Sequence, residues 1–413
     1  MLVYVLNKDG KPLMPTNRHN KVAYLLKHNL AKVVKRTPFT IQLLYESKKY
    51  TQPIALGVDA GSKTIGISAT TKSKALFEAE VKLRTDIIDN LSTRREARAN
   101  RRSRKTRYRK PRFGNRISSK KEGWLAPSVR QKVDCHLNII DRVHKILPIT
   151  RIVVETAQFD IQKIRNPGIS SIEYQQGEQF GFWNVREYVL FRDNHICQYC
   201  KGKSKDSVLN VHHIESRKTG GDAPNNLITL CETCHNKYHR GEIRVNIKRG
   251  KSFKDASFMG VLRPYILRGL KSRYSNVHNT YGYITKHTRI NHNLSKRHYV
   301  DARCISGNPL AVNNDGVFKM VKNRKHNRQI HKYGVCKGGI RKLNQSPFEV
   351  FGFRLYDKVK FRGKICFING RRLGGSFSVK DIDFNKISDG ITYKKLRLIE
   401  RVRTYKMNLV KGF

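Results

Sequence analysis

Two pairs of cysteines, each with the spacing C-x-x-C, constrain this chain more than any other feature of its sequence. Each pair can place two sulfur atoms against one ion, so both pairs together fit the tetrahedral coordination of Zn²⁺ by four thiolates. Without a metal the short segment around them would have very little core, and we therefore predict a structural zinc that contributes folding energy. The other four cysteines stand singly, as ordinary thiols of a cytosolic chain do. The predicted zinc ligands are Cys197, Cys200, Cys231 and Cys234.

Histidines cluster between and after these cysteine pairs, in the stretch VHHIESRKTGGDAPNNLITLCETCHNKYH. The stretch resembles the HNH (ββα-metal) nucleases, which implies hydrolysis of a phosphodiester. That reaction needs a base for the attacking water and a cation for the leaving oxyanion, so one histidine must stay free of metal while its neighbour binds metal. The resemblance implies that His213 is the general base and that Asn226 orients it. It also implies that His212 and His235 hold a single ion of the Mg²⁺ type.

His239 is a further candidate ligand of that ion, because it follows His235 by four residues and shares one face of an expected helix. Many HNH nucleases have Asp where this chain has His212. Both residue types bind metal, but imidazole also admits a softer ion than Mg²⁺. A different alternative is an all-structural zinc ribbon that binds nucleic acid and cuts nothing.

The charge of the chain indicates its partner. Lys and Arg number 84 against 31 Asp and Glu, which gives a formal charge of +53 at pH 7. Such a chain repels itself unless a polyanion covers its basic surface, so we expect DNA, RNA or both as stoichiometric partners. No run of about 18 apolar residues occurs, and residues 3–6 are too short for a signal-peptide core, so we expect neither a membrane span nor secretion. We expect a cytoplasmic protein that is nucleoid-associated when bound to DNA.

Hydrophobic patterning predicts a mixed α/β chain of several domains. Residues 1–52 predict a small α+β unit with about three strands. Apolar runs at 54–58 and 64–68 predict a hairpin whose first strand ends at Asp59. Further along, we expect a strand at 152–154 that ends in Glu155, helices over 129–147, 261–274 and from His298, and a barrel-like C-terminal domain with strands at 358–361, 364–368 and 376–379.

Three separated segments each present an acid. An acid at the end of one strand is most often just solvated and does not by itself indicate a metal site. The order of the three acids along the chain is what indicates one. The order resembles the split site of RuvC-type, RNase H-like nucleases, in which convergent carboxylates hold two metal ions about 4 Å apart. That resemblance implies two Mg²⁺ ions on Asp59, Glu155 and Asp301, with His298 activating or positioning the water.

An arginine-rich run, RREARANRRSRKTRYRKPR, lies between the first two of these acids. Such a run is usually a solvated tail. Here it lies inside a domain, and its self-repulsion would oppose folding without phosphates, so we favour a helix bound to nucleic acid. Arginine can bond phosphates in a bidentate manner and stack on bases. The candidate contacts are Arg94, Arg95, Arg98, Arg101, Arg102, Arg104, Arg107 and Arg109.

The whole order of motifs resembles the IscB family, transposon-encoded RNA-guided nucleases related to CRISPR type II effectors. The resemblance rests on KPLMPTNRHNKVAYLLK, GVDAGSKTIG, the arginine-rich run, RIVVETAQFD, the HNH stretch and KRHYVDA, and covers residues 1 to about 310. It implies an RNase H-like (RuvC) core that is split by a bridge helix and by a zinc-containing HNH insertion. The implied domains are PLMP 1–52, RuvC-I 53–92, bridge helix 93–115, RuvC-II 116–182, HNH 183–250, RuvC-III 251–317 and a β-rich C-terminal domain 318–413.

The resemblance also implies a monomeric ribonucleoprotein. A structured guide RNA (ωRNA) would pair with one strand of double-stranded DNA, and the C-terminal domain would read a short target-adjacent motif. HNH would cut the guide-paired strand and RuvC the displaced strand. Contacts with that motif, or merely with phosphates, are expected from Tyr356, Lys360, Arg362, Arg371 and Arg372.

Two other functions stay open. A protein-only endonuclease of the homing or restriction type would cut with HNH alone, but it leaves the order of the three acids unexplained. A non-catalytic RNA-binding protein with a zinc ribbon would explain the charge, but it leaves the pair of His213 and Asn226 unexplained.

Overall fold

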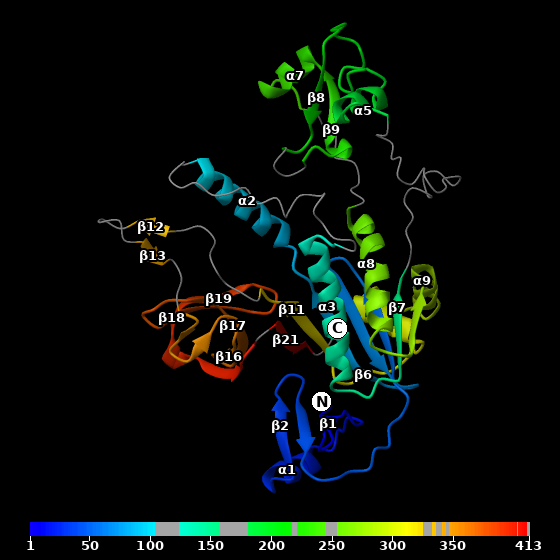
Figure 1. Ribbon diagram of the computed structural model, residues 1–413, viewed down its shortest axis with the longest axis vertical. Coiled ribbons are helices and arrows are strands. Elements are labelled where there is room, and N and C mark those ends of the chain that lie inside the picture. Colours follow the sequence, from blue (N-terminus) through cyan, green and yellow to red (C-terminus); the bar gives the residue numbers. More distant parts are fainter. Residues whose placement is uncertain are drawn as a thin grey trace. The chain divides into compact units, whose positions relative to one another are not determined.

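The computed structural model describes residues 1–103, 124–156, 181–216, 221–244, 254–324, 333–335, 341–343, 347–402 and 404–410. The chain forms two compact units (Figure 1). The first combines Met1–Gln158 with Val261–Phe413, and the second is Phe159–Gly260. The multi-domain α/β class expected from the sequence is confirmed by this division and by the mixture of helices and strands. Within the described residues, no helix combines the length and the apolar character that a membrane crossing requires.

A seven-stranded mixed sheet forms the core of the first unit, in the order β10-β7-β4-β5-β6-β11-β21. Strands β4, β5 and β6 form an antiparallel meander, and β7 pairs in parallel with β4 and with β10. Every residue of β5 from Ile65 to Thr70 is buried, as expected for a strand that is covered on both faces. The strands are β4 (Ala55–Ala60), β5 (Thr64–Thr70), β6 (Ala75–Lys82), β7 (Arg151–Glu155), β10 (Val277–Thr280), β11 (Val317–Lys322) and β21 (Tyr405–Val410).

Helices pack against this sheet. The expected helix over 129–147 is α3 (Pro127–His144), which begins with proline at its first turn and buries Val133, Leu137, Ile140 and Val143 on one side. The helix expected from His298 is α10 (His298–Ser306), which lies on β4 and β5. It ends at Gly307, whose φ of 90° suits a helix C-cap. The other helices of this unit are α1 (His19–Lys27), α2 (Ile87–Ser103), α9 (Gly282–Asn291) and most of α8 (Lys254–Lys271).

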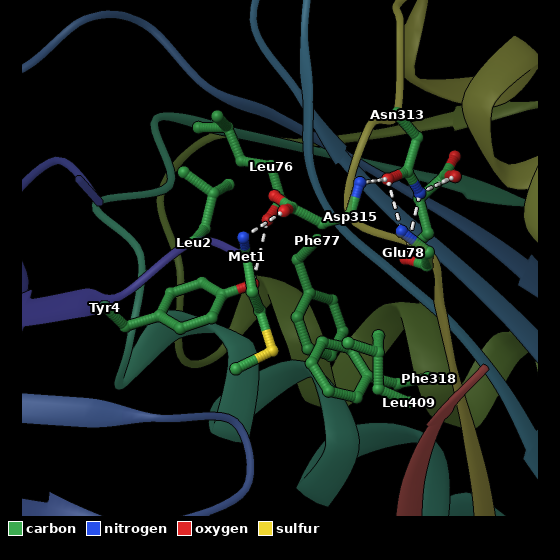
Figure 2. A pocket seen from close by; sticks show the side chains of 11 residues that line it. Met1, Leu2, Tyr4, Leu76, Phe77, Glu78, Asn313, Asp315, Phe318 and Leu409 are labelled. Atoms are coloured by element: carbon green, nitrogen blue, oxygen red, sulfur yellow. Dashed lines mark hydrogen bonds and ion pairs between the residues drawn. The ribbon is translucent and has the colours of Figure 1, made fainter. Parts of the chain in front are cut away.

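The N-terminal region is a three-stranded sheet with one helix, the α+β composition expected for residues 1–52. Its strands are β1 (Tyr4–Leu6), β2 (Ala31–Lys35) and β3 (Thr40–Leu43). The Tyr4 hydroxyl donates a 2.8 Å hydrogen bond to the carbonyl of Leu76 in the large sheet. Beside it Phe77 stacks on Phe318 with ring centroids 5.2 Å apart (Figure 2). The void among these side chains is about 10 Å³, too small for any ligand larger than water.

The C-terminal region differs from the expectation in two respects. Strands β11 and β21 join the large sheet, in which β11 pairs in parallel with β6 and β21 pairs antiparallel with β11. The separate sheet therefore starts later and ends earlier than 318–413. Its described strands follow the linear order β19-β18-β17-β16-β20 and form an open sheet, not a closed barrel. These strands are β16 (Lys358–Phe361), β17 (Lys364–Arg371), β18 (Ser376–Lys380), β19 (Lys386–Thr392) and β20 (Arg397–Glu400).

Short elements complete this region: β12 (Tyr333–Val335), β13 (Arg341–Leu343), β14 (Glu349–Val350), β15 (Phe353–Arg354) and η4 (Tyr393–Lys395). The second unit has a ββα arrangement, in which a hairpin of two strands precedes a short helix. Its elements are α5 (Val185–Arg192), β8 (Leu209–His213), η3 (Pro224–Asn226), β9 (Leu227–Cys231) and α7 (Glu232–His239).

Candidate active sites

The four cysteines of the second unit converge. Their sulfur atoms all lie within 4.8 Å of one another, and three of the four side chains are buried. Two come from the turn after α5, and the others come from the end of β9 and the first turn of α7. Ile228 and Leu230 pack around them. Four convergent thiols in an apolar shell fit one tetrahedral Zn²⁺.

A second cluster of metal-binding side chains lies in the same unit. The ring nitrogens of His212, His235 and His239 lie within 4.8 Å of one another. His212 ends β8, and the other two lie one turn apart on α7, so the hairpin and the helix together build the cluster. Among the described residues, the buried Nε2 of His212 has no hydrogen-bond partner. Three convergent imidazoles, one of which has a buried nitrogen without a hydrogen-bond partner, fit one divalent cation.

The surroundings of this cluster disfavour the charged form of two of its rings, those of His212 and His235. Burial, and then the neighbouring imidazoles, lower the pKa of His212 to about 4. Burial and the charge of His239 also lower the pKa of His235. A neutral imidazole has a free lone pair for a metal, so these ligands need no deprotonation at pH 7.

His213 is separated from this cluster by strand alternation, since successive side chains of β8 point to opposite faces. Its Nε2 lies 2.9 Å from Oδ1 of Asp222, and its side chain is 30% exposed. The adjacent histidines therefore have different surroundings, one among metal-binding rings and one beside a carboxylate and solvent. The sequence analysis missed Asp222, although an acid four residues before Asn226 is visible in the sequence.

Asn226 differs from its expected arrangement. Its side chain is fully buried, and its Oδ1 accepts a hydrogen bond from the backbone N–H of Glu215. Its Nδ2 donates to the backbone carbonyls of Glu215 and Gly221. The described bonds of this amide thus go to the backbone of the loop that connects β8 to η3, and the described partner of the His213 ring is Asp222. These bonds tie Asn226 to the loop that carries Asp222, and its role in orienting His213 stays a prediction.

The separated acids of the first unit are brought to one edge of the sheet. Asp59 and Glu155 are at the carboxyl ends of β4 and β7, whose parallel register pairs Val58 with Val154. Helix α10 adds His298 and Asp301 from its first turn. Nδ1 of His298 lies 2.6 Å from Oδ2 of Asp59. Among the described residues, these carboxylates do not form a group as tight as the histidine cluster.

Mutual repulsion marks these acids as one site. Burial, and then the charge of Asp59, raise the pKa of Glu155 and of Asp301. The hydrogen bond to Asp59 is the main cause of the raised pKa of His298. A nearby positive charge would stabilise the ionised form of each acid, and carboxylate oxygens are ligands that hard divalent cations prefer. The donor set therefore fits such cations.

Several partners of these acids were not expected from the sequence. Nε of Arg289 lies 2.9 Å from Oδ1 of Asp301. A hydrogen bond from the Thr285 hydroxyl and the charge of Arg263 both lower the pKa of Glu155, against the larger effects that raise it. The Glu80 carboxylate accepts a 3.1 Å hydrogen bond from the backbone N–H of His298. These residues come from α9, α8 and β6, and no sequence spacing connects them to the acids.

The structure describes the positions of some of the arginines that are expected to contact nucleic acid. Exposed on α2 are Arg94, Arg95, Arg98 and Arg102. The side chain of Arg101 lies outside the described part of the chain, as do Arg104, Arg107 and Arg109.

In the C-terminal sheet, Lys360 and Arg362 are exposed and Tyr356 is half-buried. Arg371 donates to the carbonyl of Phe348, and Arg372 is in an ion pair with Asp389. The last two therefore already have partners within the protein.

Family models match two parts of the chain. Residues 3–177 match the model described as RRXRR protein, and residues 197–241 match the model described as HNH endonuclease. Among curated proteins, Anaredoxin of Nostoc sp. is 38% identical over 58 residues, which are 14% of this chain and 74% of that protein. The HNH match includes every cysteine and histidine of the two clusters in the second unit.

Two solved structures of Streptococcus thermophilus Cas9 are also similar. One, in complex with the GGAA PAM, has 14% identity and a TM-score of 0.33 over 50% of this chain and 30% of that chain. The other, with the AGAA PAM, has 12% identity and a TM-score of 0.33 over 62% of this chain and 32% of that chain. The chain thus spans about a third of these Cas9 chains, and at such TM-scores neither match carries weight for function.

Proposed function

This chain belongs to the IscB-like HNH DNA endonucleases, and we propose that it is guided by RNA and cuts the two strands of a DNA duplex at two centres. The observation that carries the proposal is the presence of two chemically different clusters in separate units, one of imidazoles and one of carboxylates with a histidine. One centre would cut the guide-paired strand and the other the displaced strand.

The imidazole centre would cut the guide-paired strand. His213 has the exposure to reach a water and accept its proton, while Asp222 holds the other side of the ring. His212, His235 and His239 would hold one divalent ion, Mg²⁺ or a softer ion, which neutralises the leaving oxyanion when bound. The zinc on the four cysteines would fix α7 against β9, and so fix the ligands that α7 carries.

The carboxylate centre would cut the displaced strand, as a RuvC-like site. Asp59, Glu155 and Asp301 would hold two Mg²⁺ ions, which supply charge neutralisation on both sides of the scissile phosphate. Asp59 also holds the His298 ring by a 2.6 Å contact, so His298 is oriented for contact with the attacking water. Arg289 and Arg263 offset the repulsion among the acids.

The excess of positive charge supports RNA as a partner. A charge of +53 on 413 residues suits a stoichiometric polyanion, and the exposed arginines of α2 suit phosphate binding. We propose a monomeric cytoplasmic ribonucleoprotein with a structured guide RNA. Lys360 and Arg362 on the C-terminal sheet have the exposure that contact with a target-adjacent motif requires.

A second candidate is a protein-only endonuclease. The observation in its favour is that the second unit is compact by itself and contains both the four-cysteine cluster and the imidazole cluster. Such an enzyme would cut through this unit alone and would read its sequence without RNA.

One experiment distinguishes these functions. The protein is expressed with the transcript that flanks its gene, purified, and incubated with plasmids that contain a guide-matched target beside randomised bases. We expect cleavage only beside particular bases, no cleavage of a mismatched target, and loss of activity after treatment with RNase. RNA-free protein of equal activity and sequence preference would establish the protein-only endonuclease instead.

A further inference from the structure

The backbone of His298 rests directly on the middle strand of the β4-β5-β6 meander. Its carbonyl oxygen is so close to Gly66 that a Cβ on Gly66 would lie 1.9 Å from it. Only a glycine allows this approach. His298 is thereby placed over one defined position of β5.

The residues on either side of that position are both acids. The sheet register pairs Gly66 with Asp59 on β4 and with Glu80 on β6. Paired residues of neighbouring strands point to the same face, so the three form one row across the sheet, with His298 over the middle of the row. Asp59 contacts the His298 ring at 2.6 Å, and Glu80 accepts a 3.1 Å hydrogen bond from its backbone N–H. The histidine is held from both sides, by its ring and by its backbone.

The rest of α10 is fixed independently of Glu80. Farther along the helix, a Cβ on Gly57 would lie 1.9 Å from the carbonyl oxygen of Ala302. Arg303 makes two hydrogen bonds, of 2.7 and 2.9 Å, to the fully buried carboxylate of Glu78. Loss of the Glu80 contact would therefore leave the helix in place and free only its first residue.

We propose that Glu80 is a positioning residue of the carboxylate centre, which fixes the backbone of His298 so that its ring meets Asp59. This inference rests on the proposed function of that centre. It assigns Glu80 a role in the cut of one strand only, through a hydrogen-bond acceptor and not through a charge. A carboxylate that bound a metal ion would instead need its charge.

The test is a double-mutant cycle with a strand-resolved readout. Wild type, Glu80→Ala, Glu80→Gln, His298→Ala and the double variant Glu80→Ala/His298→Ala are loaded with guide RNA. Single-turnover rates are then measured on a duplex labelled on both strands. We expect Glu80→Ala to slow the cut of the displaced strand about tenfold, which is the loss expected for a helix-terminal hydrogen bond. Glu80→Gln should keep most of the rate, because its amide oxygen can accept the same hydrogen bond.

The double variant decides whether Glu80 acts through His298. We expect it to cut the displaced strand no more slowly than His298→Ala alone, since the second change removes nothing further. Three results would each overturn the proposal. The double variant could lose rate by the product of the two single losses, Glu80→Gln could be as slow as Glu80→Ala, or Glu80→Ala could cut at the wild-type rate. The guide-paired strand, cut in the other unit, reports loading with guide RNA and binding of the duplex, and should be cut at the wild-type rate throughout. The melting temperature of each variant, compared with that of wild type, reports the folding of the first unit. Glu46→Ala, at an exposed position, is the matched control.

Asp59→Ala separates failure of this inference from failure of the proposed function. If Asp59→Ala abolishes the cut of the displaced strand while Glu80→Ala leaves it unchanged, only the role of Glu80 is refuted. If Asp59→Ala leaves both cuts at the wild-type rate, the carboxylate centre does not cut, and both proposals fail.

Discussion

The imidazole centre and the carboxylate centre each place a histidine beside an aspartate, yet they are built in opposite ways. His213 lies 2.9 Å from Asp222, a loop residue whose side chain is 47% exposed. His298 lies 2.6 Å from Asp59, which ends a central strand and is 15% exposed. The first centre is assembled within one ββα hairpin and the second from three separated segments on a large sheet. We therefore expect the order of the first to depend on a zinc ion at the four cysteines, and the order of the second to depend on the packing of α10.

The metal-binding groups differ in the same way. The first centre offers three imidazoles, which suit borderline and softer ions, and the second offers three carboxylates, which suit hard ions. Changes that remove one centre should leave the other intact, and the cleavage predictions below depend on that independence.

Loss of the structural zinc should have the largest effect. Cys231→Ser removes one of four thiolates, and a structural zinc contributes on the order of 10 kcal/mol to the folding of a small module. We expect the variant to lose bound zinc and the cut of the guide-paired strand, with the cut of the displaced strand retained. Zinc content by mass spectrometry and strand-resolved cleavage check this. Cys366→Ala, in the C-terminal sheet, is the control and should keep its zinc. Loss of both cuts in Cys231→Ser would contradict independent centres.

Gly57→Ala should impair the cut of the displaced strand and spare the cut of the guide-paired strand. The new methyl group would meet the backbone of α10, which cannot rotate away, at a cost of about 3 kcal/mol, the upper end for overpacking. We expect a lower melting temperature of the first unit and a slower cut of the displaced strand. Gly260→Ala, where a Cβ would have nothing within 4 Å, is the matched control. Equal melting temperatures for the two variants would mean that α10 is not packed as closely as described.

Acid should destabilise the first unit through His136. Burial lowers the pKa of this enclosed histidine from 6.5 to about 4. A lowered pKa means that the unfolded chain binds the proton first, so the stabilising contribution is complete above pH 6.5 and is lost as the pH falls toward 4. We expect about 2 kcal/mol to be lost between pH 7 and pH 5. Urea unfolding at both pH values, with His136→Gln as the comparison, measures this. A variant with the same pH dependence as wild type would exclude His136 as the cause.

Metal preference should show the smallest difference. In Asp59→Ala only the imidazole centre can cut, and in His213→Ala only the carboxylate centre can. We expect replacement of Mg²⁺ by Ni²⁺ or Co²⁺ to favour the imidazole centre over the carboxylate centre by about tenfold. Metal titrations of the two variants on the same duplex give this ratio. Identical metal profiles would show that the difference in ligands has no consequence.

The clustering of the histidines and of the cysteines in the second unit could be predicted, because these residues are close together in the chain. The cysteine pairs and the histidines of α7 have spacings that a turn and a helix determine. The hydrogen bonds between the Asn226 amide and the loop backbone could not be predicted, because the spacing of residues does not determine the conformation of a loop.

The carboxylate centre is less accessible from sequence. The ends of β4 and β7 could be predicted from apolar runs that stop at an acid. The contacts of Arg289 and Glu80 could not, since they arise where α9 and β6 meet α10 in three dimensions. The C-terminal region shows a similar limit. The apolar runs predicted strands, but they did not predict that β11 and β21 extend the large sheet beyond β6. That pairing depends on the three-dimensional arrangement of the strands.

The most direct test is strand-resolved cleavage of a guide-matched duplex by Asp59→Ala and by His213→Ala. Loss of either residue should slow one strand's cut by a factor of 100 or more, roughly the contribution of one catalytic acid or base. We predict that His213→Ala cuts only the displaced strand and that Asp59→Ala cuts only the guide-paired strand. An undiminished double-strand break from either variant would contradict the existence of two separate centres.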